Sequence, residues 1–221
     1  MLKKIILKTL KYLGITVASL LALMFLLPML FPKTVADKIK SWANHTISGE
    51  MNFSSARLSF FKHFPSLTLT LYDFSLKGSA PFQEDTLADA RELSMGVNLM
   101  SVFSKTLSID KIYLSDGGIN ILVDSGGRAN YNVYKSSGKS TDTSETSLNL
   151  QKIEIDNCNL IYDDRSIPIR IGAKGLNYLG RGDLSKSLFD LYSHIAINAF
   201  DLTYDTSSYM LSKKLEGDIV T

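Results

Sequence analysis

The amino-acid sequence predicts a mainly β protein preceded by an N-terminal transmembrane helix. Three observations lead to this prediction: an uncharged apolar segment near the N-terminus, alternating apolar and polar residues after residue 50, and an apolar pattern that returns about every 42 residues. The chain has 221 residues, of which 45% are hydrophobic. This length allows one large domain or two small ones, and this apolar content is sufficient for a core.

Residues 13–31 carry no charged side chain. As a helix rising ~1.5 Å per residue, they would span roughly 28 Å, close to the hydrocarbon thickness of a bilayer. Four lysines lie within residues 1–12, so the positive-inside rule places this basic flank in the cytoplasm and the body across the membrane. A cleaved signal peptide is the alternative, but its apolar region is usually only about 7–15 residues long. We therefore expect an uncleaved single-pass anchor.

Residues 33–48 are predicted to form a short amphipathic helix, because their apolar residues recur at helical spacing. Trp42 is a residue type typical of membrane interfaces, and Lys38 and Lys40 are placed to meet lipid headgroups. A helix that closes the end of the following β domain with the same apolar face would show the same pattern. The sequence leaves both interpretations open.

Charge is distributed unevenly along the chain. Residues 1–40 contain seven Lys and one Asp, whereas residues 41–221 contain 17 Lys+Arg and 21 Asp+Glu. The body is therefore mildly acidic, which argues against nucleic acid as a partner, since such binding usually needs a basic face. A single cysteine also excludes an internal disulfide framework and a Cys-based zinc cluster.

Residues 50–221 read as one β domain with a flexible loop at 135–147, where no residue is able to anchor a core. Within this domain an apolar-x-apolar pair is followed, five positions later, by a third apolar residue. The four copies are Leu69, Leu71 and Leu76; Ile112, Leu114 and Ile119; Ile153, Ile155 and Leu160; and Ile195, Ile197 and Leu202. Such spacing is long enough for a repeating unit of several strands.

In each copy the apolar residues change parity before the third position, which requires a bulge or a tight turn in the strand. The residues that suit such a break are Asp73, Asp116, Gly117, Gly118, Asp156, Asn157 and Asn198. The chain stops soon after the fourth copy, so we expect either a truncation or an open end at the C-terminus.

No catalytic or metal-binding motif stands out. His45, His63 and His194 show no ligand spacing with one another or with Cys158. The sequence contains no G-x-S-x-G, Walker A or H-E-x-x-H motif. We therefore expect no enzymatic activity, no cofactor and no metal site.

Four segments, together with the N-terminal anchor, carry a resemblance to a known family. They read Phe64-Pro-Ser-Leu-Thr-Leu-Thr-Leu-Tyr-Asp-Phe-Ser-Leu76, Leu87-Ala-Asp-Ala-Arg-Glu-Leu-Ser-Met-Gly-Val-Asn-Leu-Met-Ser101, Ile109-Asp-Lys-Ile-Tyr-Leu114 and Asp124-Ser-Gly-Gly-Arg-Ala-Asn-Tyr131. Over roughly residues 1–135, the chain resembles the AsmA family of bacterial envelope proteins. Members of this family are generally much longer.

The resemblance implies an elongated, mostly antiparallel repeating β-groove, a trough with an apolar lining. It further implies an inner-membrane protein whose body lies in the periplasm and takes part in phospholipid transport toward the outer membrane. The implied groove-lining residues are Leu69, Leu71, Ile112, Leu114, Ile153, Ile155, Ile195 and Ile197. Without the resemblance, a closed sandwich core would be preferred for these residues. A scaffold that assists outer-membrane protein assembly or envelope integrity, with envelope proteins as partners, is the alternative function.

Overall fold

The computed structural model describes residues 8–16, 18–19, 22, 37, 47–59, 67–97, 108–133, 147–182 and 190–220. They form a short N-terminal helical segment and one nine-stranded sheet, so the predicted mainly β fold is confirmed. The strands are β1 (Met51–Asn52), β2 (Ser55–Ser59), β3 (Leu67–Lys77), β4 (Thr86–Val97), β5 (Ser108–Val123), β6 (Ser147–Asp164), β7 (Ile169–Arg181), β8 (Tyr192–Tyr204) and β9 (Ser207–Val220).

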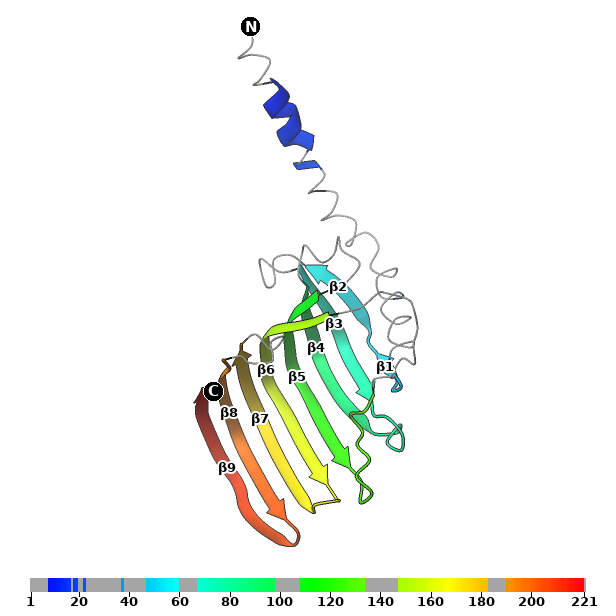
Figure 1. The fold of residues 1–221 in the computed structure, drawn as a ribbon, viewed down its shortest axis with the longest axis vertical. Helices are drawn as coiled ribbons and strands as arrows, with labels where there is room; N and C mark the ends of the chain where they lie inside the picture. Colours follow the sequence, from blue (N-terminus) through cyan, green and yellow to red (C-terminus); the bar gives the residue numbers. More distant parts are fainter. Residues whose placement is uncertain are drawn as a thin grey trace.

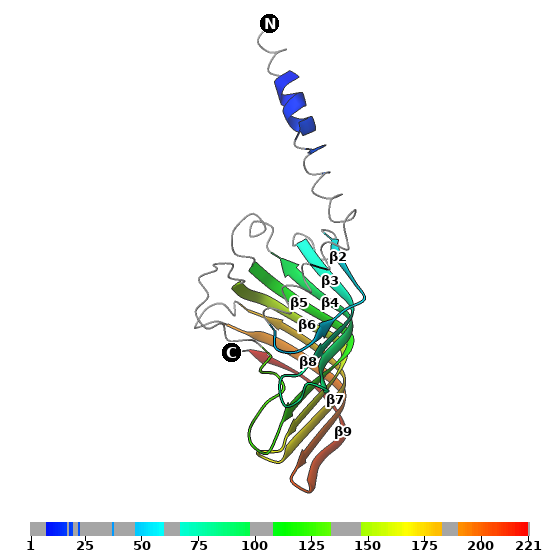
Figure 2. The same cartoon turned by 90° about the vertical axis from the view of Figure 1, so that its right-hand side faces the viewer.

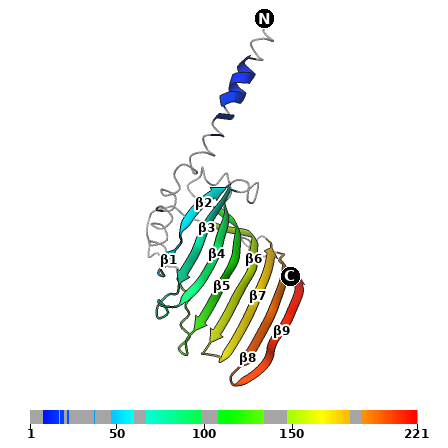
Figure 3. The same ribbon diagram turned by 180° about the vertical axis from the view of Figure 1, so that it is seen from behind.

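The strands lie side by side in a single open layer (Figures 1 and 3). Their order is β1-β3-β4-β5-β6-β7-β8-β9, with β2 also paired to β3. Every pair is antiparallel except β5 with β6, which is parallel. The mostly antiparallel sheet expected from the sequence is therefore present. We call the end at which β3, β5, β6 and β8 begin the upper end, as it is drawn in Figure 1.

Several predictions from the sequence concern residues that lie outside the described part of the chain. In the described part of the chain, no helical stretch has both the length and the apolar character that crossing a membrane requires. The expected anchor at 13–31 lies mostly outside the described residues. The same is true of the expected amphipathic helix at 33–48, including Trp42, Lys38 and Lys40, and of the expected loop at 135–147.

The four copies of the apolar pattern lie in β3, β5, β6 and β8. In the parallel β5–β6 pair, Ile112 stands beside Ile153 and Leu114 beside Ile155. The pairing register thus equals the offset of 41 residues between these two copies in the sequence. Like positions of the two copies consequently fall on the same face of the sheet, and β4 and β7 fill the positions between the other copies.

Left-handed backbone breaks the strands where the sequence predicts a change of parity. Asp73, Asp116 and Asn157 have φ angles of 49°, 52° and 48°. Gly175 in β7 and Ser212 in β9 have φ angles of 60° and 50°. Among the described residues, the other candidates are not left-handed; these are Gly117, Gly118, Asp156 and Asn198.

The breaks in β3, β5, β6 and β7 lie at neighbouring levels across the sheet, and we call this line the crease. Arg91 of β4 forms an ion pair with Asp116, and Asn157 Nδ2 donates a hydrogen bond to Asp116 Oδ1 at 2.7 Å. Asn157 N in turn donates to Asn177 Oδ1 at 3.0 Å, which extends the line to β7. The strands bend part-way along their length, and the sheet curves into a trough (Figure 2).

Glycine is needed at position 175 for two reasons. Its φ of +60° is a conformation that costs other L-residues roughly 1–2 kcal/mol. A Cβ at this position would also overlap the side-chain amide of Asn198 on β8. Gly127 has a similar φ of +77° but open space around it, and Gly217 has open space and no left-handed φ.

These three glycines give a graded test of the crease. Gly175→Ala should lower the free energy of unfolding by about 2 kcal/mol or more, because it combines backbone strain with an overlap. Gly127→Ala should cost about 1 kcal/mol from strain alone, and Gly217→Ala should have little effect. Urea unfolding of the full chain in detergent, followed by circular dichroism, measures all three. Equal effects at positions 175 and 217 would contradict the assigned role of the crease.

Candidate functional site

One face of the sheet is apolar on both sides of the crease, and we call it the apolar face. Above the crease, neighbouring strands bring together one row across the sheet: Leu71, Leu93, Leu114, Ile155, Tyr178 and Ile195. A second row lies just below the breaks of β3 and β6 and just above those of β7 and β9: Phe74, Ala90, Cys158, Leu176, Ile197 and Leu215. The face therefore runs without interruption from β3 to β9.

Side chains from the two sides of the crease pack against one another. Leu114, from above the crease, shares a buried cluster with Cys158, from below it. Ile155 also packs against a cluster that contains Ala173, which lies below the break at Gly175. Cys158 is 0% exposed, although no second layer of described residues covers the middle of this face. This packing across the crease places the apolar face on the inside of the bend.

All eight residues expected to line the groove lie on this apolar face, as their strand pairings show. Three of them are buried in its floor, namely Leu71, Leu114 and Ile197. The other five are partly exposed and accessible from solvent: Leu69, Ile112, Ile153, Ile155 and Ile195. The structure thus brings the predicted residues together, and their contact with lipid stays a prediction.

Two strands contribute residues to the apolar face that the repeat pattern does not include. They are β4, with Leu93 and Met95, and β7, with Leu176 and Tyr178. In β4 these side chains alternate with Glu92 and Ser94. This period of two is the signal by which sequence analysis could have found them.

Small residues occupy the centre of the face, directly below the crease. Ala90 and Cys158 lie in one buried cluster, and Gly117 stands beside Ala90 in the register. A Cβ on Gly117 would overlap the backbone of Asp89. The inside of the bend therefore has little room for side chains. Burial raises the pKa of the Cys158 thiol, which favours the unreactive protonated form.

The β3 side of the trough is closed by the chain that precedes it. Phe53 and Ala56 are 6% and 5% exposed and pack with Leu71 and Phe74. The β9 side is different, because no described strand pairs with the outer edge of β9. Leu211 on this strand is 67% exposed.

The segment Asp124–Tyr131 caps the lower end of β5. The Asp124 carboxylate accepts hydrogen bonds from the backbone N–H groups of Gly126 and Arg128, both at 2.9 Å, and from Arg128 Nε at 2.7 Å. The bonds from Arg128 hold the pKa of Asp124 below its ordinary value of 3.8. Asn130 is fully buried, and its Oδ1 accepts a hydrogen bond from Leu122 N at 3.0 Å. This segment thus has a structural role.

The sequence matches a known protein family. The family model of AsmA matches residues 7–170, about three quarters of the chain. The chain belongs to the AsmA family. The AsmA match includes β1 to β6, the crease residues up to Asn157 and the cap that begins at Asp124. No curated protein matches the chain significantly.

The floor of the trough should contribute strongly to stability. Leu71→Ala removes a side chain that is 1% exposed, so it should lower the free energy of unfolding by about 2–5 kcal/mol. Leu211→Ala, the same change at an exposed position, should alter it by less than about 0.5 kcal/mol. Denaturant unfolding of both variants measures the difference. A small effect at Leu71 would show that the apolar face is not packed.

The cap should make stability depend on pH. Since the folded-state pKa of Asp124 is lowered, the stabilisation from its carboxylate is complete above the ordinary value of 3.8 and is lost as pH falls through the lowered pKa. Asp124→Asn should therefore melt at a lower temperature than wild type at neutral pH, and the gap should close in acid. Glu84→Gln, at an exposed position, is the control and should show no such gap. A gap that persists in acid would argue against a role for the ionised carboxylate.

Proposed function

We propose that this chain binds lipid acyl chains along its apolar face and takes part in phospholipid transport to, or homeostasis of, the outer membrane. The main observation that supports this proposal is the continuous apolar face from β3 to β9. This face lies inside the bend and has partly exposed residues along it. An open trough in an AsmA-family chain fits a lipid-binding envelope protein.

The physical need for such a face can be stated as a free energy. Each acyl CH₂ moved from the bilayer into water costs about 0.8 kcal/mol, so a sixteen-carbon chain costs roughly 13 kcal/mol. A strip of aliphatic side chains offsets most of this cost along the whole length of the acyl chain. The headgroup can stay in water at the open side. Binding of this kind uses no catalytic group, and the proposed role is not enzymatic.

The proposed location follows from the sequence. Residues 13–31 would anchor the chain in the inner membrane, with residues 1–12 in the cytoplasm and the sheet in the periplasm. Phospholipid and the inner membrane are the proposed partners. In this arrangement the trough takes up acyl chains outside the bilayer that holds its anchor.

A second candidate function rests on the outer edge of β9. In the described part of the chain this edge has no paired strand, and exposed strand edges can accept a strand of another polypeptide. Tyr209 and Leu211 on β9 are each 67% exposed. A scaffold that holds outer-membrane protein clients would use this edge, and its bound partner would be a polypeptide.

A photo-crosslinking amino acid at two positions of β6 tests the lipid proposal. Ile153 and Ile161 are both partly exposed, but Ile153 lies on the apolar face and Ile161 on the opposite face. In the full chain, produced in the envelope of a diderm bacterium, position 153 should give phospholipid adducts by mass spectrometry. Position 161 should give at least several-fold fewer adducts.

The same pair of positions provides matched charge variants. Ile153→Asp should lower the amount of co-purifying phospholipid several-fold, because it places a carboxylate in the acyl-chain path. Ile161→Asp should leave that amount unchanged. Equal crosslinking at both positions, or adducts to polypeptide instead of lipid at position 153, would refute acyl-chain binding and favour the scaffold.

A further inference from the structure

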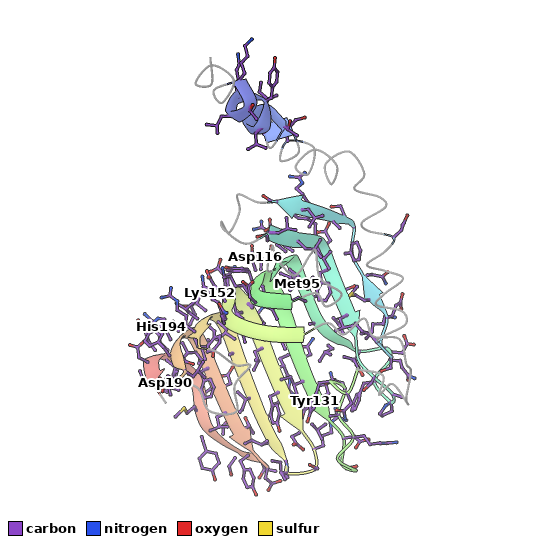
Figure 4. All side chains as sticks on the ribbon, turned by 45° about the horizontal axis from the view of Figure 1, so that its top comes forward. Met95, Asp116, Tyr131, Lys152, Asp190 and His194 are labelled. Carbon is purple, nitrogen blue, oxygen red and sulfur yellow. The ribbon has the colours of Figure 1, made fainter. Side chains whose placement is uncertain are left out.

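The opposite face of the sheet is polar, and it carries a cavity of about 290 Å³ near its upper end. The cavity lies over β6, β7 and β8. Its lining includes four charged residues and one histidine, namely Lys152, Glu154, Asp156, Arg181 and His194. Figure 4 labels Lys152 and His194 near each other on this part of the molecule. Ile155 and Tyr178 of the apolar face also border the cavity, but most of its lining comes from the polar face.

The upper end of the cavity is cationic. The strand register places Lys111 beside Lys152 and Lys152 beside Arg181, so three cations lie in one row. Like charges directly opposite on neighbouring strands destabilise a sheet. Lys152 Nζ lies 2.5 Å from Glu154 Oε2 and 5.0 Å from the centroid of the Tyr113 ring. Arg181 is exposed and forms no ion pair among the described residues, so its guanidinium is available to a ligand.

The lower end of the cavity is anionic. Glu154 and Asp156 follow Lys152 at intervals of two along β6, which places all three on one face, with about 6.8 Å along the strand between each residue and the next. His194 is already engaged, since its Nδ1 lies 2.9 Å from Asp218 Oδ1. The two cations and two carboxylates of the walls cancel in charge, and Lys152 and Glu154 are paired with each other. A bound ligand would replace this contact, with its negative end toward Arg181 and its positive end toward Asp156. Such walls suit a ligand with a negative end and a positive end better than a simple anion.

We propose that this cavity binds the phosphoethanolamine-type zwitterion of an aminophospholipid headgroup. Its phosphate would bind Lys152 and Arg181, since the fork of an arginine matches phosphate oxygens in pairs. Its ammonium would bind Glu154 and Asp156, and a two-carbon link fits within the spacing between the two ends. The choice of a lipid headgroup rests on the proposed function. Because the trough is on the other face of the sheet, the two sites engage different lipid molecules.

Calorimetric titration of the full-length chain in nonionic detergent tests this site. The probes are glycerophosphoethanolamine, glycerophosphoglycerol and inorganic phosphate, which separate a zwitterionic headgroup, an anionic headgroup and free phosphate. Glycerophosphoethanolamine should bind saturably and most tightly. Arg181→Gln should weaken its binding about ten-fold, which corresponds to losing one charge-assisted hydrogen bond. Arg181→Lys should weaken it less, because the charge remains and the fork is lost.

Two further variants complete the test. Glu154→Gln should remove the preference for the amine-bearing probe. Lys174→Gln, an exposed change on β7 outside the cavity, should leave every affinity unchanged. Circular dichroism of each variant establishes folding.

Several results would overturn the headgroup site: no saturable binding, equal affinity for inorganic phosphate and glycerophosphoethanolamine, or equal losses in the Arg181 and Lys174 variants. Lipid crosslinking at Ile153, on the apolar face, measures acyl-chain binding in the trough separately. If the wild-type chain showed no headgroup binding but still gave lipid crosslinks at position 153, the headgroup site would be refuted and the proposed function would stand.

Discussion

The crease is the constraint on which the rest of the structure depends. No second layer of described residues covers the apolar face, so residues of this face bury one another. Left-handed residues in β3, β5, β6, β7 and β9 bend the sheet and bring the upper and lower halves of the face together. For Asp73, Asp116 and Asn157 that conformation costs roughly 1–2 kcal/mol each, although Asp and Asn tolerate it better than most residues. Side-chain hydrogen bonds offset part of this cost, such as Ser54 Oγ to Asp73 Oδ2 at 2.6 Å.

The crease also keeps apolar side chains on one face of the sheet and most polar side chains on the other. Side chains of a strand alternate between the two faces of the sheet. If the bend changed only the direction of a strand, residues of the same parity, odd or even, would point to the apolar face along its whole length. Here the parity changes at the bend, and apolar residues continue on the inner face both above and below it. The outer face is thereby left mostly to polar and charged residues, with a few apolar ones such as Ile161 and Leu179. A proposed path for acyl chains and a proposed site for headgroups can then occupy the two sides of one sheet.

Much of this arrangement could be predicted from the sequence, because it depends on local patterns. Alternation predicted the strands, and the change of parity at Leu71–Leu76 and its copies predicted a break, which Asp73, Asp116 and Asn157 confirm. The parallel pairing of β5 with β6 could not be predicted, since register depends on contacts between segments far apart in the chain. The polar cavity was missed for the same reason. Lys152 and Arg181 become neighbours only through the β6–β7 pairing, and neither residue belongs to a motif.

The small residues at the centre of the trough have a consequence for observing its motion. Cys158 is the one cysteine in the sequence, and its side chain is wholly enclosed where the two halves of the apolar face meet. A thiol reagent can therefore reach it only when strands around it separate. Local opening of this kind has its own free energy, distinct from that of global unfolding. The rate at which a thiol reagent labels Cys158 in the unmodified protein therefore reports how often the trough opens locally. This rate would fall if a bound ligand held the two halves of the apolar face together.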